Sequence, residues 1–211
     1  MRRSAASVIA ILVLALPPST CAESWNLHAG AGLAFPVGSA ALQEGLGTGW
    51  SATLGVGYEA TPSLAVLVRA SYSDFPRDDE GTLLVAALDQ QPHRVLEITG
   101  GTMTSWDVAG EIRFSLSPEA PTVHPYLLGA AGLVSYEYER VDIAYAYAGH
   151  TWPATIPGER DTAACLSAGG GVRFETRPWL EFVVDTRLHI TLRGDGALWS
   201  VPLWLTIAVS P

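Results

Sequence analysis

Three titratable side chains recur at every fourth position near the carboxyl end of the chain: Glu181, Asp185 and His189. Two carboxylates and an imidazole could bind a metal ion, or they could act as a general acid and a general base. Four residues of a β-strand span about 13 Å, so neighbours on one strand alone cannot hold a single ion. Arg187 lies among them, and the spacing therefore favours ion pairing, with a metal site as the alternative.

These residues belong to a run with two-residue alternation, which predicts a β-strand over residues 180–193. Its second face is apolar and carries no charge. The same alternation recurs in seven other segments, which we predict to be strands: residues 25–35, 50–60, 64–73, 106–116, 126–138, 164–175 and 199–209.

The connections between these segments are alternately long and short, which is typical of an antiparallel barrel with short turns at one end. We therefore predict an all-β fold, an eight-stranded antiparallel transmembrane β-barrel. Two connections, residues 75–102 and 139–161, are predicted as long loops, the first with a short helix near residues 83–88.

Charged side chains on the predicted strands fall on the face opposite to the apolar one. Arg or Lys on the lipid face at mid-bilayer costs about 2–4 kcal/mol, so we expect the charged face to point inward. The interior of such a barrel has room only for side chains, which favours an ion-paired filling over an ion or proton path. The predicted interior ionic network comprises Arg69, Asp107, Glu111, Arg113, Arg173, Glu181, Asp185, Arg187 and His189, and the inward face also includes Glu59, Glu137, Glu175 and Arg193.

Aromatic residues gather near the ends of the predicted strands. Membrane barrels carry such residues as girdles at the two bilayer interfaces. The predicted girdles comprise Trp25, Trp50, Tyr58, Tyr72, Trp106, Phe114, Tyr126, Tyr136, Phe174 and Trp199.

The charge balance argues against one class of partner. The 211 residues carry a net charge of −9 with only 12 Lys plus Arg, so the chain lacks the basic surface that a phosphate backbone requires. We therefore expect no nucleic-acid partner.

The amino terminus has the pattern of a secretory signal. Met1-Arg2-Arg3 precedes an apolar run over residues 5–16 and small residues up to Ala22, which predicts a leader over 1–22 and a barrel domain over 23–211. A lipidated Cys21 is the alternative. Cleavage after Ala22 leaves Cys165 as the only cysteine, so no internal disulfide is expected.

Glycine-rich strand segments carry a resemblance to a known family: Ala29 to Pro36, Pro125 to Gly132 and Ser167 to Phe174. Together with the leader, they make the chain resemble the small eight-stranded outer-membrane β-barrels of Gram-negative bacteria, which include the OmpA transmembrane domain. The resemblance implies an outer-membrane location, contact with outer-membrane lipid and lipopolysaccharide, and insertion by the barrel assembly machinery. It implies no cofactor and no catalytic residue.

We therefore expect a structural or surface-interaction role. One alternative is a soluble, lipocalin-like barrel that binds an apolar ligand, and another is a small channel. A third is a lipid A-modifying hydrolase, because His189 and Thr191 resemble the His and Ser of outer-membrane lipid A deacylases.

Two loops could carry binding chemistry. Tyr145, Tyr147, His150 and Trp152 are interpreted as a surface that binds a partner or as a lid over the barrel mouth, with the lid favoured. The acidic residues over 74–80 are interpreted as a solvated loop, with a calcium site as the alternative.

Overall fold

The computed structural model describes residues 25–37, 45–79, 94–147, 150–194 and 196–210. The predicted leader and the helix predicted near residues 83–88 lie outside these residues. No helix in the described part of the chain is long and apolar enough to cross a membrane.

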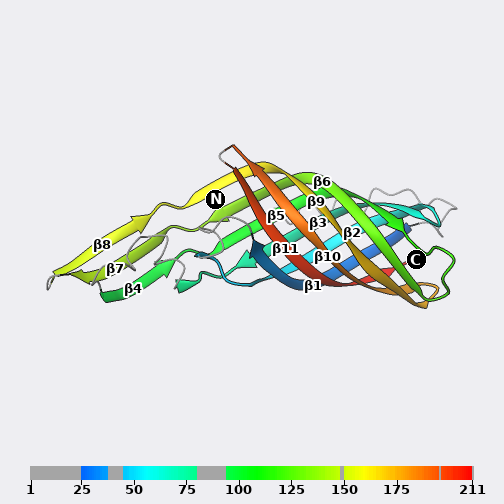
Figure 1. The fold of residues 1–211 in the computed structure, drawn as a ribbon, viewed down its shortest axis with the longest axis horizontal. Helices are drawn as coiled ribbons and strands as arrows, with labels where there is room; N and C mark the ends of the chain where they lie inside the picture. Colours follow the sequence, from blue (N-terminus) through cyan, green and yellow to red (C-terminus); the bar gives the residue numbers. More distant parts are fainter. Residues whose placement is uncertain (1–24, 38–44, 80–93, 148–149, 195, 211) are drawn as a thin grey trace, which may run out of the picture.

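Eight antiparallel strands close into a barrel in the order β1-β11-β10-β9-β6-β5-β3-β2, which confirms the predicted fold class (Figure 1). Three turns, between β2 and β3, β5 and β6, and β9 and β10, lie at what we call the turn end, and the opposite end is the loop end. The barrel strands are β1 (Trp25–Val37), β2 (Gly49–Thr61), β3 (Leu64–Phe75), β5 (Met103–Ser115), β6 (Val123–Tyr138), β9 (Glu159–Arg177), β10 (Leu180–Arg193) and β11 (Gly196–Val209).

A second sheet projects from the loop end and consists of β4 (Arg94–Gly100), β7 (Val141–Tyr147) and β8 (His150–Ile156) in the order β4-β7-β8. It extends the molecule along its longest axis, away from the barrel (Figure 1). Residues 75–102 and 139–161 were predicted as loops without strands, and this prediction was wrong. The alternation of Val141 and Ile143, both buried, with Asp142 and Ala144 is the strand signal that this prediction missed.

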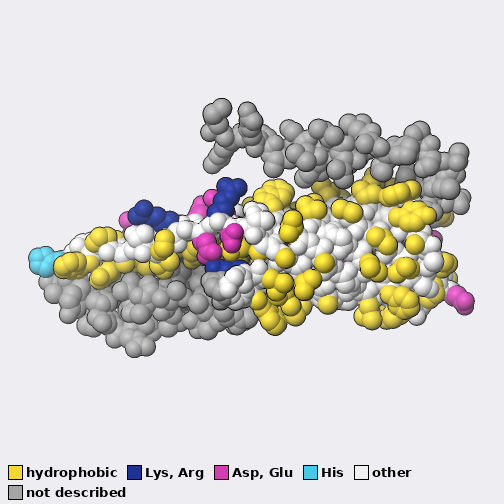
Figure 2. Space-filling model, turned by 90° about the horizontal axis from the view of Figure 1, so that it is seen from above, with side chains coloured by type: hydrophobic (Ala, Val, Ile, Leu, Met, Phe, Trp, Pro, Cys, Tyr) yellow, Lys and Arg dark blue, Asp and Glu magenta, His cyan; other side chains and the backbone are white. Residues whose placement is uncertain are grey.

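The barrel wall separates an apolar outside from a mainly polar inside. Large apolar side chains such as Val108, Leu133 and Leu205 are more than half exposed, whereas Arg69, Glu111 and Asp185 are buried. In the space-filling view, hydrophobic side chains cover the barrel, and charged side chains gather where the barrel meets the projecting sheet (Figure 2). This arrangement follows from the two-residue alternation, because successive side chains point to opposite faces of a strand.

Aromatic side chains line the two ends of the apolar surface. At the loop end the ring centroids of Trp50 and Tyr72 are 5.2 Å apart, and those of Tyr72 and Trp106 are 4.6 Å apart. At the turn end, Trp25 and Tyr58 form a corresponding pair with centroids 5.1 Å apart. Phe114, Phe174 and Trp199 are also exposed on the outer face.

Strand β6 has the opposite parity to the predicted one. Tyr126 and Tyr136, which we predicted in the girdles, point inward and are buried, whereas Leu127 and Leu133 face outward. Both faces of this strand are apolar, so alternation alone does not distinguish them. The ring of Tyr126 fits inside because its cross-strand neighbour is Gly171, which has no side chain.

The same shift of parity moves Glu137 from the inward face to the outer one. Its carboxylate is more than half exposed and lies 3.8 Å from Arg160 near the loop end of the barrel. Only the end of the strand carries this charge, so the middle of the outer face of β6 stays uncharged.

Two glycines of β6 provide a matched test of the wall. A Cβ added to the inward-facing Gly132 would lie 2.6 Å from the Cα of Ala109, whereas one added to Gly129 would meet no atom within 4 Å. We expect Gly132→Ala to lower the free energy of unfolding in detergent micelles by about 1–3 kcal/mol, because the strands must separate. Gly129→Ala is the control and should leave that value unchanged. Equal stability of the two variants in urea titrations would contradict this packing.

Candidate functional site

The centre of the barrel is occupied by one carboxylate that contacts three arginines. The Glu111 carboxylate accepts a hydrogen bond of 2.6 Å from Arg113 Nε and one of 2.7 Å from Arg187 Nη1. Arg69 Nε lies 3.3 Å from Glu111 Oε2. Glu111 and Arg113 extend from β5, Arg69 from β3 and Arg187 from β10, so this contact ties strands on different sides of the lumen.

Asp185 on β10 is the second anion of this group. It accepts a hydrogen bond of 2.8 Å from Arg187 Nη2 and one of 3.1 Å from the Tyr126 hydroxyl. Arg69 and Arg113 each approach its Oδ2 to 3.8 Å. We refer to Arg69, Glu111, Arg113, Asp185 and Arg187 as the central cluster.

Trp204 on β11, which is not among the predicted site residues, completes the packing around the cluster. Its ring centroid lies 5.0 Å from the guanidinium carbon of Arg69 and 4.6 Å from that of Arg187. Its indole N–H donates to the Ser51 hydroxyl. The alternation of residues 199–209 already places position 204 on the inward face, and that parity is the signal that identifies it.

The central cluster carries three guanidinium cations and two carboxylates, an excess of one positive charge. Burying charges is costly unless they are paired and hydrogen-bonded. The faces of Trp204 and Tyr126 reduce that cost through cation–π contacts, with Arg113 lying 4.8 Å from the Tyr126 ring centroid. The aromatic side chains therefore stabilise the one positive charge that the two carboxylates do not neutralise.

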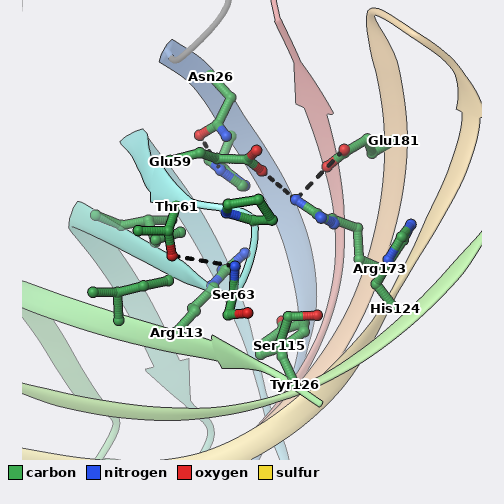
Figure 3. Close-up of a pocket in the computed structure, with 15 residues that line it drawn as sticks. Asn26, Glu59, Thr61, Ser63, Arg113, Ser115, His124, Tyr126, Arg173 and Glu181 are labelled. Atoms are coloured by element: carbon green, nitrogen blue, oxygen red, sulfur yellow. Dashed lines mark hydrogen bonds and ion pairs between the residues drawn. The ribbon is translucent and has the colours of Figure 1, made fainter. Parts of the chain in front are cut away.

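A cavity of about 30 Å³ lies on the turn-end side of the central cluster, where Arg113 and Tyr126 form part of its lining (Figure 3). Arg173 lies between Glu59, with which it is ion-paired, and Glu181, which is 3.7 Å away. Arg173 thus serves two carboxylates at once, and this group carries one more anion than cations.

A second cavity of about 40 Å³, the loop-end cavity, lies on the other side of the central cluster. Its lining is mostly apolar and includes Phe75, Met103, Val134 and Leu198. Each cavity has room for only about three water-sized groups. The buried central cluster lies between the two.

Apolar side chains close the loop end. Leu46 and Phe75 are buried and pack with Ala34, against which Met103 and Tyr138 also pack. Backbone hydrogen bonds fix the segment that carries Leu46, from Gly47 N to Pro76 O at 2.8 Å and from Asp78 N to Gly45 O at 3.0 Å. Leu46, Phe75 and Met103 also form part of the lining of the loop-end cavity.

Other residues of the predicted network lie inside the barrel but outside the central cluster. His189 Nδ1 lies 3.0 Å from the Ser167 hydroxyl. Asp107 lies opposite Ser71 and has no ion pair within 4.0 Å among the described residues. Thr191 is buried in the lumen, so neither it nor His189 is placed at the lipid face, where a lipid-directed hydrolase would need them.

Neither metal alternative gains support from the arrangement of donors. In the described part of the chain, no three His, Cys, Asp or Glu side chains are close enough together to hold an ion. In the acidic loop, Asp79 instead accepts a hydrogen bond of 2.6 Å from Arg77 Nε.

The projecting sheet is the second candidate site. Its β7–β8 hairpin extends away from the barrel, so the lid interpretation of this loop was wrong (Figure 1). Trp152 on β8 and Leu96 on β4 are each about half exposed. On the polar face, hydrogen bonds from Arg140 and Thr155 hold the pKa of the Asp142 carboxyl below its ordinary value.

Comparisons with known proteins show the fold class. No family model and no curated protein matches the chain. Neisserial surface protein A has a TM-score of 0.56 at 15% identity, over 89% of this chain and 97% of that one. A major outer membrane protein from Thermus thermophilus has a TM-score of 0.51 at 13% identity, over 88% of this chain and 99% of that one. The attachment invasion locus protein Ail of Yersinia pestis has a lower TM-score of 0.44 at 14% identity, over 88% and 99%. The chain therefore has the fold of the small outer-membrane β-barrels.

The charge balance of the central cluster gives a directional prediction. Glu111→Gln leaves three buried arginines with only Asp185, so we expect it to cost about 3–5 kcal/mol of unfolding free energy. Arg69→Leu removes the excess cation and should cost less, although it loses the contact with Trp204. Urea titrations of both variants in the same detergent measure the difference. A larger loss for Arg69→Leu would contradict the role of Glu111 as the common partner.

Proposed function

We propose that the chain is a closed outer-membrane anchor that presents the sheet of β4, β7 and β8 to the cell exterior as a surface-interaction element. The observation that carries the proposal is that β6 and β9 continue from the barrel to its loop end, where the projecting sheet begins. In outer-membrane barrels the short turns face the periplasm and the longer connections face outward, which gives this orientation.

The apolar outer face supports the membrane location. Its exposed Leu, Val and Ile side chains lie between the aromatic rings at the two ends, as expected of a surface in contact with lipid. In this proposal the outer face contacts outer-membrane lipid and lipopolysaccharide, and the barrel assembly machinery inserts the chain after the leader is removed. A soluble lipocalin-like barrel would need the reverse arrangement, with an apolar interior and a polar outside.

The projecting sheet has the features of a binding surface. Trp152 and Leu96 expose apolar area on a structure that is otherwise surrounded by solvent in this orientation. Backbone pairing of β7 with both β4 and β8 holds the three strands together, so a partner would meet a preformed surface.

The orientation can be tested on intact cells with single cysteines in a Cys165→Ser background. We expect a membrane-impermeant maleimide to label His150→Cys without permeabilisation, because His150 is exposed on β8. Glu119→Cys, in the exposed turn between β5 and β6, is the matched control and should be labelled only after the outer membrane is opened. The reverse labelling pattern would exclude the proposed orientation.

The closed lumen predicts electrical silence. In planar bilayers we expect no single-channel steps from the purified protein, because the central cluster and the apolar closure at Leu46 and Phe75 fill the barrel. A heat-dependent shift in gel mobility of the same sample establishes that the barrel is folded. Regular conductance steps from such a sample would favour the channel alternative.

A further inference from the structure

Buried polar atoms that lack a hydrogen-bond partner gather around one cavity. Among the described residues, nine buried side-chain nitrogen or oxygen atoms make no hydrogen bond within the protein. Four of them belong to residues that line the cavity beside Arg113 and Tyr126, which we call the turn-end cavity (Figure 3): His28 Nδ1, Arg113 Nη2, Ser115 Oγ and His124 Nε2. A buried donor or acceptor without a partner is costly, so four such atoms around one space indicate a ligand there.

The loop-end cavity provides an internal comparison. The two cavities are similar in size, with volumes of about 30 Å³ at the turn end and about 40 Å³ at the loop end. In the described part of the chain, none of the unpartnered atoms belongs to a residue that lines the loop-end cavity. The need for a polar ligand is therefore specific to the turn-end cavity.

The unpartnered atoms include both acceptors and donors. His28 Nε2 donates to Asn26 Oδ1 at 2.7 Å, because an amide oxygen can only accept, and this leaves His28 Nδ1 as an acceptor. His124 Nδ1 donates likewise to a backbone carbonyl at 3.2 Å, and its Nε2 lies 3.7 Å from Glu175, too far for a hydrogen bond. Arg113 Nη2 can only donate. The ligand must therefore donate to imidazole nitrogens and accept from a guanidinium.

The charges around the cavity favour a neutral ligand. The central cluster, which reaches the cavity through Arg113, has one excess positive charge, and the group of Arg173, Glu59 and Glu181 has one excess negative charge. An anion could not donate to the two imidazoles, and the guanidiniums of Arg113 and Arg173 would repel a cation. Water is neutral and both donates and accepts. A volume of about 30 Å³ holds two or three waters at about 10–15 Å³ each.

We propose that the turn-end cavity is a binding site for two or three ordered water molecules. These waters pair with the imidazoles of His28 and His124, the Ser115 hydroxyl and the free N–H of Arg113. They thereby hydrate the central cluster on one side and stabilise its excess positive charge. The loop-end cavity stays dry, because its lining offers no unpartnered atom to hold a water.

X-ray footprinting tests the water site. Irradiation of the folded protein in detergent micelles makes hydroxyl radicals from each water in place, and mass spectrometry maps the oxidised side chains. Each rate is divided by the rate of the same residue in urea-unfolded protein. We expect the buried Tyr126 and His28 to be oxidised roughly tenfold faster than the buried Phe75, which lines the loop-end cavity. A radical scavenger in the bulk solvent should leave the rates of Tyr126 and His28 unchanged. Rates equal to that of Phe75, or rates that the scavenger suppresses, would overturn the proposed site.

Filling the cavity provides a second test. Ala65 on β3 lines it, and its cross-strand neighbours are Glu59 and Arg113. We expect Ala65→Leu to displace the waters and to lower both oxidation rates at the turn-end cavity to the level of the loop-end cavity. Ala70→Leu places the same side chain on the outer face of β3, and this control should leave both rates unchanged.

A heat-dependent shift in gel mobility establishes that each variant is folded. If Ala65→Leu lacks that shift, the smaller Ala65→Val is measured in its place and should lower the same two rates. Unchanged oxidation of Tyr126 and His28 in a folded variant of Ala65 would refute the water site.

Discussion

The contact of Glu111 with three arginines is the interaction on which the rest of the barrel depends. An eight-stranded barrel has no space inside for bulk water, so the charges on its inner face depend on other side chains in the lumen for their stabilisation. The Glu111 carboxylate meets this requirement for Arg69, Arg113 and Arg187 together, and Asp185 shares Arg187. Because these residues come from three strands, the pairing also fixes how those strands face one another across the lumen.

The outer face follows from the same alternation. When the charged positions of a strand face the lumen, the alternate positions point outward and must be apolar to suit a hydrocarbon environment. That requirement ends where the strands leave the apolar zone, which is where Glu137, Arg160 and Glu159 appear at the loop end. The projecting sheet therefore begins at the level where polar side chains become tolerable on both faces.

The parts of the fold that the sequence predicts are those in which one face differs chemically from the other. The β2–β3 hairpin and β10 alternate clearly, and the inward positions of Arg69, Glu111 and Asp185 follow from parity alone. Strand β6 has apolar residues on both faces, and the aromatic rings of Tyr126 and Tyr136 looked like girdle residues for that reason. The inward position of Tyr126 depends on the space beside Gly171 and on the hydrogen bond that its hydroxyl donates to Asp185. The hydroxyl of Tyr136 donates a hydrogen bond to Glu159 in the same way.

Two other features depend on contacts between distant segments and could not be read from local pattern. The strands of the projecting sheet are short, seven residues each, and β4 meets β7 only after the chain has crossed from β5 to β6. Trp204 has an inward parity, but its role depends on which arginines face it, and that is set by barrel order and register. Parity assigns a side chain to a face, whereas only the three-dimensional arrangement assigns its partner.

Arg187 connects the central cluster to the part of the wall that contains Pro202. The register of β10 and β11 places Arg187 opposite Pro202, which lacks a backbone N–H, and Glu111 and Asp185 hold the Arg187 guanidinium on the inner side. Charge-assisted hydrogen bonds are stronger than the backbone bond that proline removes. The ion pairs therefore secure β10 at the point where the neighbouring strand lacks a backbone donor.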